Sequence, residues 1–227
     1  MKDNFIAQSF GKSQNYTDIP NQLYKEYNVK KGLRNEDGTG VRVGLTRVSD
    51  VVGYDLVDGV KTNVAGRLYY RGYDIVDIAA ARAKDAVGYE EVMFLLLFGF
   101  LPSKREFDNF NDILRDMYAL PNDFLEMNLL RMPAQNLMNK LQHAVLTLYN
   151  YDEDPDNVEV YSTLLKGLDI TAKLPSIMCY AYQAKRHYFN NDSLIIHYPD
   201  EKLSMAENIL QMLRVDQKFS KNEAALL

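Results

Sequence analysis

One helix-start signal occurs three times in this sequence and constrains the fold more than any other feature. In each copy a serine is followed three residues later by a glutamate, and the two side chains satisfy backbone N–H groups that the first helical turn leaves unpaired. The three pairs are Ser103 with Glu106, Ser204 with Glu207 and Ser220 with Glu223. Apolar residues at helical spacing follow each pair, so a helix is predicted to begin at each serine.

Apolar periodicity predicts helices through most of the chain from residue 74 onward. Residues 89–98 are apolar nearly all round, which predicts a short buried helix that ends at Gly99. A long helical pattern runs from Val158 to Arg186, and Pro175 is expected to kink it because proline removes a backbone donor. Further helices are expected over residues 19–27, 104–117, 122–131, 137–148 and 205–213.

Residues 32–73 have a β-rich pattern instead. Apolar and β-branched residues alternate with polar ones from Val41 to Val52, Leu68-Tyr69-Tyr70 forms a second run, and Asp58-Gly59 punctuates the segment. Two to four short strands are predicted, too few to be stable alone and expected to lie on a helical body. The predicted fold class is all-α with a small N-terminal β-rich excursion. Its parts are a tail with a short helix (1–31), the β-rich segment (32–73) and the helical part (74–227).

Charge and composition exclude several classes of function. The chain has 26 Lys and Arg against 31 Asp and Glu, a net charge of −5, and its basic residues are scattered, so a nucleic-acid binder is not expected. The N-terminus lacks the apolar run of a signal peptide, and the longest apolar stretch, residues 92–101, is too short to span a bilayer. The single cysteine, Cys179, cannot form an internal disulfide. A cytoplasmic protein without nucleic-acid or membrane partners is therefore expected.

The three histidines do not form a recognisable site. None of His143, His187 and His197 has a second histidine or a carboxylate at the spacing of a zinc site, so no metal is expected and each is interpreted as structural. Residues 37–40, Asp-Gly-Thr-Gly, lack the lysine and the strand-to-helix setting of a phosphate loop, and a turn is expected there.

The acidic residues and the thiol also have structural explanations. Glu90 and Glu91 fall at a helix start, where carboxylates interact favourably with the helix dipole. Residues 152–156 are rich in aspartate but lack the spacing of a calcium loop, so a solvated loop is expected. Cys179 lies in an apolar helical stretch without a histidine partner, which predicts a buried, inert thiol. Taken alone, the residues show no catalytic constellation.

The last capping pair opens a helix that reads Ala224-Ala225-Leu226-Leu227, where the sequence stops. A helix this short is not stable alone, and natural C-termini are usually polar. We therefore expect a sequence cut within an element. The alternative is a short apolar tail that docks on the core as a true terminus.

Several strings, taken together, resemble the opening part of citrate synthases. In the family's order they are Gly32-Leu33-Arg34-Asn35, Gly44-Leu45-Thr46, residues 66–75 (GRLYYRGYDI), residues 89–102 with their EEV, LLL and G-x-LP elements, Ala172-Lys173-Leu174-Pro175, and residues 206–210 (AENIL). Each string is weak alone, but their common order makes them specific. The chain is identified from them as a member of that family over about residues 32–227.

The resemblance implies a helical, homodimeric enzyme that condenses acetyl-CoA with oxaloacetate to citrate and free CoA, the entry to the tricarboxylic acid cycle, without a cofactor. Such chemistry needs a positioned base and a stabilised enolate oxygen. In the family, two histidines and an aspartate carry out this reaction. The first of them belongs to an H-x-x-H-x-G-G string, which would start beyond Leu227. No catalytic residue is therefore expected in this chain. Arg34 falls where some members place an arginine near the CoA phosphates, with a plain surface role as the alternative interpretation.

Two expectations follow for the chain by itself. It should lack citrate synthase activity, and it should expose apolar surface because the long helix around Pro175 lacks part of its packing. Two alternatives stay open. One is a 2-methylcitrate synthase that uses propionyl-CoA, and the other is a non-catalytic module that dimerises with a full-length relative.

Overall fold

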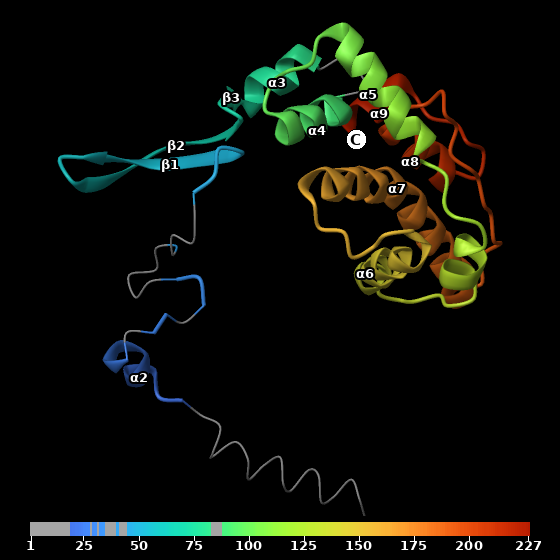
Figure 1. Ribbon diagram of the computed structural model, residues 1–227, viewed down its shortest axis with the longest axis horizontal. Helices are drawn as coiled ribbons and strands as arrows, with labels where there is room; N and C mark the ends of the chain where they lie inside the picture. The colour runs from blue at the N-terminus through green and yellow to red at the C-terminus, as the bar shows by residue number, and fades with distance from the viewer. Residues whose placement is uncertain (1–18, 28, 31, 35–39, 41–44, 83–87) are drawn as a thin grey trace, which may run out of the picture. The chain divides into compact units, whose positions relative to one another are not determined.

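The computed structural model describes residues 19–27, 29–30, 32–34, 40, 45–82 and 88–227 (Figure 1). The chain divides into two compact units, Met1–Thr46 and Arg47–Leu227, and each is considered by itself. The described part of the first unit holds helix α2 (Asn21–Glu26) and an antiparallel bridge between Arg34 and Gly40. The helix predicted over residues 19–27 is confirmed. The turn predicted at residues 37–40 lies outside the described residues, apart from Gly40.

The second unit begins with a three-stranded antiparallel sheet in the order β1-β2-β3. Strands β1 (Ser49–Val57) and β2 (Val60–Tyr70) form a hairpin, and β3 (Tyr73–Asp74) pairs with the end of β2. Asp58 and Gly59 form the turn of the hairpin, and their φ angles are +52° and +77°. A two-residue hairpin turn with positive φ at both residues has a twist that matches the twist of the two strands. Strands are present over residues 49–74 of the predicted β-rich segment, whereas Val41 and Val43 of that pattern lie outside the described residues. The hairpin strands are nine and eleven residues long, which is longer than predicted.

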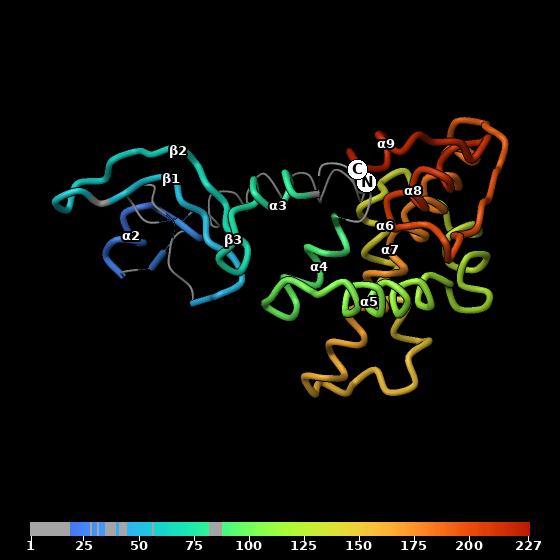
Figure 2. Tube along the Cα trace, turned by 90° about the horizontal axis from the view of Figure 1, so that it is seen from above, coloured from blue at the N-terminus to red at the C-terminus, as the bar shows by residue number. Residues whose placement is uncertain are grey.

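The rest of the described second unit is helical (Figure 2). The elements are α3 (Ile75–Arg82), α4 (Gly88–Phe98), α5 (Lys104–Asp116), a π-helix (Leu125–Leu130), α6 (Leu137–Leu148), a 3-10 turn (Tyr149–Tyr151), α7 (Val160–Asn190), α8 (Met205–Leu213) and α9 (Lys221–Leu226). All three predicted capping boxes are formed, with both hydrogen bonds present in each. Across these residues and those of the first unit that are described, no helix has the length and apolarity needed to cross a bilayer.

Helix α7 is the centre of the hydrophobic core, and it packs against α5, α6, α8 and the π-helix (Figure 1). One buried cluster joins α7 to its neighbours through residues that include Ile177, Leu129 and Met212. A second cluster joins the earlier turns of α7 to α4 and α5 through residues that include Leu168 and Phe94. Truncating a buried leucine to alanine typically costs about 2–5 kcal/mol. These two clusters therefore hold the helices around α7.

The π-helix differs from the ordinary helix predicted over residues 122–131. Its wider turn is seen where the N–H of Arg131 donates to the carbonyl of Glu126, five residues earlier, at 3.0 Å. Helix α7 itself continues through Pro175 without a break. The bend expected at Pro175 stays a prediction.

Helix α4 was predicted to be buried all round, and this prediction is wrong. Its buried residues are Glu90, Glu91, Phe94 and Leu95, whereas Tyr89, Leu97 and Phe98 are exposed. The physical reason is that α4 packs against α5 and α8 with one side only, so the apolar side chains on its other side are exposed.

Candidate functional site

An apolar groove of about 310 Å³ lies beside Pro175 on the central helix. Helix α7 lines it with Pro175 and Met178, α8 lines it with Ile209, and Tyr89 and Leu227 also line it. No lining side chain carries a charge. Apolar surface was predicted to be exposed around Pro175, and this groove is such a surface.

A second apolar groove, of about 570 Å³, runs between α4 and α7. Its walls include Met93 and Leu96 from α4 and Leu164 from α7. The two grooves share Tyr89 and Thr171 as lining residues, so they adjoin along α7. Surfaces of this kind pack against apolar chain or apolar ligands, but they offer no group to move a proton.

A buried carboxylate joins α4 to the start of α8. Glu90 is 2% exposed, and its Oε1 accepts a hydrogen bond at 2.8 Å from the backbone N–H of Met205, the first residue of α8. The first N–H groups of a helix have no partner inside it, and a negative charge there is favourable. Glu90 does lie in the first turn of its own helix, as predicted, but it also caps a helix 115 residues away.

Burial controls the electrostatics of this junction. It raises the pKa of Glu90 above the ordinary value of 4.5, because the charged carboxylate loses its hydration. The hydrogen bond from Met205 and the charge of Arg115 lower the pKa, but more weakly. Oε2 of Glu90 is buried and makes no hydrogen bond with the described residues. Neither groove is lined by Glu90, so the arrangement is structural rather than catalytic.

The histidines are held in separate places. His143 is exposed on α6, while Nδ1 of His187 lies 2.8 Å from the carbonyl oxygen of Asp192, just after α7. Nδ1 of His197 lies 2.7 Å from the side-chain nitrogen of Gln217. In the parts of the chain that the structure describes, no three His, Cys, Asp or Glu side chains gather as a metal site would need.

The acidic loop and the thiol have the local surroundings that the sequence predicted. In the loop, Lys166 pairs with Asp152 at 3.4 Å, and the hydroxyl of Tyr149 donates to Asp156 at 3.1 Å. Cys179 is fully buried, and burial raises the pKa of its thiol to about 12. A thiol of this kind stays protonated at neutral pH and is a poor nucleophile.

Arg34, the single candidate for substrate binding, is exposed and lies at the antiparallel bridge with Gly40. The bridge orders its backbone in the described part of the first unit. Its assignment to a phosphate of CoA stays a prediction.

Comparison with known proteins identifies a related family. Residues 35–227 match a family model described as "Citrate synthase, C-terminal domain". A citrate synthase of Haloferax volcanii is 36% identical over 193 residues, which are 83% of this chain and 44% of the relative. A citrate synthase of Corynebacterium glutamicum is 34% identical over 151 residues, 66% of this chain and 32% of the relative. The chain therefore spans less than half the length of these two relatives.

Solved structures show the same fold. The citrate synthase of Pyrobaculum aerophilum superposes with a TM-score of 0.60 at 26% identity, covering 80% of this chain and 44% of that one. A citrate synthase of Thermoplasma acidophilum, in a ternary complex with carboxymethyl coenzyme A and oxaloacetate, gives a TM-score of 0.65 at 19% identity. That match covers 82% of this chain and 43% of that one, and it bears on the fold alone.

Proposed function

The chain belongs to the citrate synthase family, and on that premise we propose that it supplies the helical scaffold of an enzyme that condenses acetyl-CoA with oxaloacetate to give citrate and free CoA. The match of residues 35–227 to the family model carries the proposal. The relatives and solved structures named above, which are citrate synthases, support it. Because the chain spans less than half of those relatives, the activity is proposed for the whole enzyme.

We assign no catalytic residue within the chain. Forming the enol of acetyl-CoA needs a base within hydrogen-bond reach of a weakly acidic carbon and donors for the enolate oxygen. The two grooves have no such base, and the histidines lie elsewhere. The H-x-x-H-x-G-G string of the family does not occur in the sequence. The purified chain is therefore expected to release no CoA.

The assembled enzyme is proposed to be a cytoplasmic homodimer that needs no cofactor and binds neither nucleic acid nor membrane. The adjoining apolar grooves on α7 support association, because apolar surface of this size is favourably buried against another protein surface. Arg34 is proposed to contact a phosphate of CoA, for which its exposed guanidinium is suited.

Two alternatives share this scaffold. The grooves also favour a non-catalytic module that associates with a full-length relative, since they offer packing surface without chemistry. A 2-methylcitrate synthase, which uses propionyl-CoA, would have the same fold, so the experiment has to offer both acyl-CoAs.

Fragment complementation tests the proposal. The purified chain is mixed with the portion of the Haloferax volcanii citrate synthase that follows its matched region, and CoA release from acetyl-CoA or propionyl-CoA is measured with oxaloacetate. The chain alone should release none, and the mixture should release CoA faster from acetyl-CoA. A preference for propionyl-CoA supports the 2-methylcitrate alternative. A stable mixed complex without CoA release supports the interaction module, and CoA release by the chain alone contradicts the scaffold proposal.

Sequencing the DNA past Leu227 gives an independent answer. A continuing reading frame with an H-x-x-H-x-G-G string supports the enzyme, whereas an immediate stop codon supports the interaction module.

A further inference from the structure

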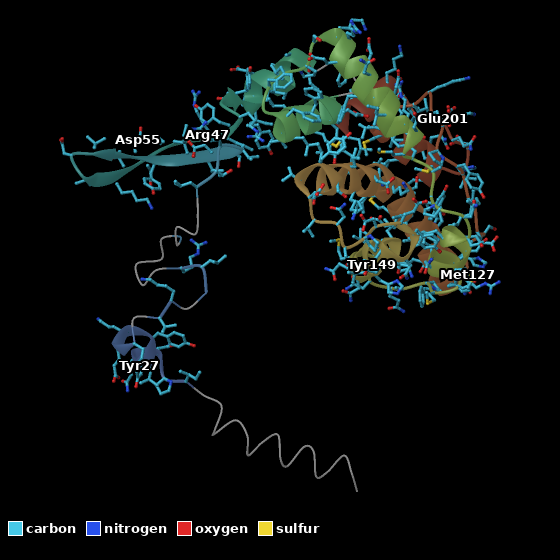
Figure 3. The ribbon with its side chains drawn as sticks, in the orientation of Figure 1. Tyr27, Arg47, Asp55, Met127, Tyr149 and Glu201 are labelled. Carbon is cyan, nitrogen blue, oxygen red and sulfur yellow. The ribbon has the colours of Figure 1, made fainter. Side chains whose placement is uncertain are left out.

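A pocket of about 490 Å³ lies beside the π-helix, and it shares no lining residue with either groove. Three segments of the chain line it: residues 118–123 with Leu125, Glu126 and Leu130, then Ser176 and Tyr180 on α7, and then Ile196, Tyr198 and Pro199 in the loop before α8. Figure 3 labels Met127, which belongs to the π-helix. We call it the tyrosine pocket, because Tyr118, Tyr180 and Tyr198 all line it.

One wall of the tyrosine pocket has an unusual backbone. Asp123 has φ of +62°, in the left-handed region, and the π-helix begins two residues later. Phe124 and Leu129, in the same segment, are completely buried in the core. Aspartate tolerates this left-handed conformation, and core packing holds the segment that follows it. π-helical turns are frequent at functional sites, which directs attention to the pocket that this segment lines.

Two of the tyrosines that line the pocket are deeply buried. Tyr118 and Tyr180 are 5% and 2% exposed as residues, and neither hydroxyl makes a hydrogen bond with another residue of the described chain. A ligand or water in the pocket can therefore supply the hydrogen-bond partner of such a hydroxyl. The ring of Tyr198 meets the ring of Tyr180 edge-on, with centroids 6.3 Å apart and planes at 68°. The pocket thus combines aromatic walls with phenol oxygens.

The rim of the tyrosine pocket is acidic. Asp123 and Glu126 line it and are exposed, and neither has an ion-pair partner among the residues described. No lysine, arginine or histidine lines the pocket. Burial raises the pKa of both Tyr118 and Tyr180, so the two phenols are neutral at physiological pH. The two carboxylates therefore set the charge of the lining.

We propose that the tyrosine pocket binds a small alkylammonium ion. The carboxylates of Asp123 and Glu126 attract the cation, and the tyrosine rings stabilise it through cation–π contacts. Its N–H groups donate to phenol oxygens of the tyrosines that line the pocket. The same rim repels carboxylates and phosphates, so anionic ligands are disfavoured in the pocket. The inference does not depend on that reaction.

Titration of the full chain with n-butylammonium chloride tests the inference. Binding is followed by amide chemical shifts at constant ionic strength, with 1-butanol and butyrate as neutral and anionic analogues of the same length. The cation should bind saturably and about tenfold more tightly than 1-butanol, and butyrate should not bind. The shifted amides should fall in residues 118–126, around Tyr180 and at residues 196–199. Equal binding of the cation and 1-butanol, or no saturable binding of the cation, overturns the inference.

Variants at exposed positions locate the site without disturbing the core. The double variant Asp123→Asn/Glu126→Gln removes the rim charge, and asparagine tolerates the left-handed backbone as aspartate does. It should weaken butylammonium binding about five- to tenfold. Tyr198→Leu should also weaken binding, whereas Tyr198→Phe keeps the ring and should not. The control Glu201→Gln changes an exposed carboxylate that does not line the pocket and should have no effect. An unchanged affinity in the double variant overturns the inference.

Discussion

The carboxylate of Glu90 and the backbone N–H of Met205 meet at 2.8 Å, although 115 residues separate them in the sequence. The bond places the first turn of α4 against the first turn of α8. Helix starts present their unpaired N–H groups in one direction, so the contact also fixes the orientation of α8. A single buried side chain thereby links two helices that the sequence keeps far apart.

Removing this carboxylate should destabilise the fold. Glu90→Ala leaves the N–H of Met205 without its acceptor and opens a cavity, and we expect a loss of about 2–4 kcal/mol in the free energy of unfolding. Glu90→Gln keeps an acceptor oxygen and nearly the same volume, so its loss should be less than half as large. Urea unfolding followed by far-UV circular dichroism measures both. Equal losses in the two variants would show that the oxygen acceptor does not matter.

Glu90 should also make stability depend on pH with an unusual sign for a carboxyl group. Its pKa is raised in the folded chain above the ordinary value of 4.5. Its contribution is therefore fully present below pH 4.5 and is lost as pH rises through the raised value. The free energy of unfolding of the wild type, relative to Glu90→Gln, should fall as pH increases from 4.5. A flat difference between the two proteins over that range would contradict the burial argument.

Glu223 should behave in the opposite way. Hydrogen bonds from Arg214 and Ser220 lower the pKa of Glu223 to about 2. The stability that it gives to α9 is therefore present above pH 4.5 and is lost as pH falls towards 2. The protection of the Ala224 amide against hydrogen exchange, measured by NMR relative to the intrinsic exchange rate at each pH, should decrease over that window. In Glu223→Gln this decrease should be much smaller, whereas Glu201→Gln, a change at an exposed turn, should behave like the wild type.

Cys179 should be inert in the folded chain. The thiol is fully buried, and its pKa is raised to about 12 by that burial. A thiol-reactive disulfide reagent at pH 8 should therefore modify it at the rate of unfolding, rather than at the rate of a free thiol. Absorbance of the released product measures this rate, and urea should accelerate it. Reaction within seconds in native buffer would mean that α7 opens locally.

The apolar grooves should bind the dye ANS. Tyr89 lines both grooves and is 56% exposed, so Tyr89→Glu should reduce ANS fluorescence while changing stability by less than about 1 kcal/mol. Tyr161→Glu is the matched control, because Tyr161 is exposed and lines neither groove. Equal fluorescence of both variants and the wild type would place the dye elsewhere.

The helix starts were predictable because they are local. The pairs Ser103 with Glu106 and Ser204 with Glu207 close their hydrogen bonds within one turn, so the sequence contains both partners at a fixed distance. The Asp58-Gly59 turn is local in the same sense, and its residues tolerate positive φ.

Contacts between distant segments were not predictable. Nothing near Glu90 in the sequence indicates Met205, and an apolar pattern does not tell which side of α4 is covered. The π-helix depends on Phe124 and Leu129 entering the core, so tertiary packing decides it rather than propensity. The tyrosine pocket draws its lining from three separate segments, which no spacing rule connects. The sequence motifs shared with the family indicated the fold. The residues that the fold brings together from distant segments could be identified only from the structure.

The hairpin has a consequence for how the protein is handled. Among the described strands, β1 lies at an edge of the sheet, and the exposed side chains along it include Val51, Tyr54 and Val57. Such an edge is a template on which the strand of another molecule can add, and the irregular register between Val52 and Tyr54 limits this by interrupting a regular ladder. In concentrated solution, aggregation should therefore begin at β1, and a lysine at Val51 should delay it.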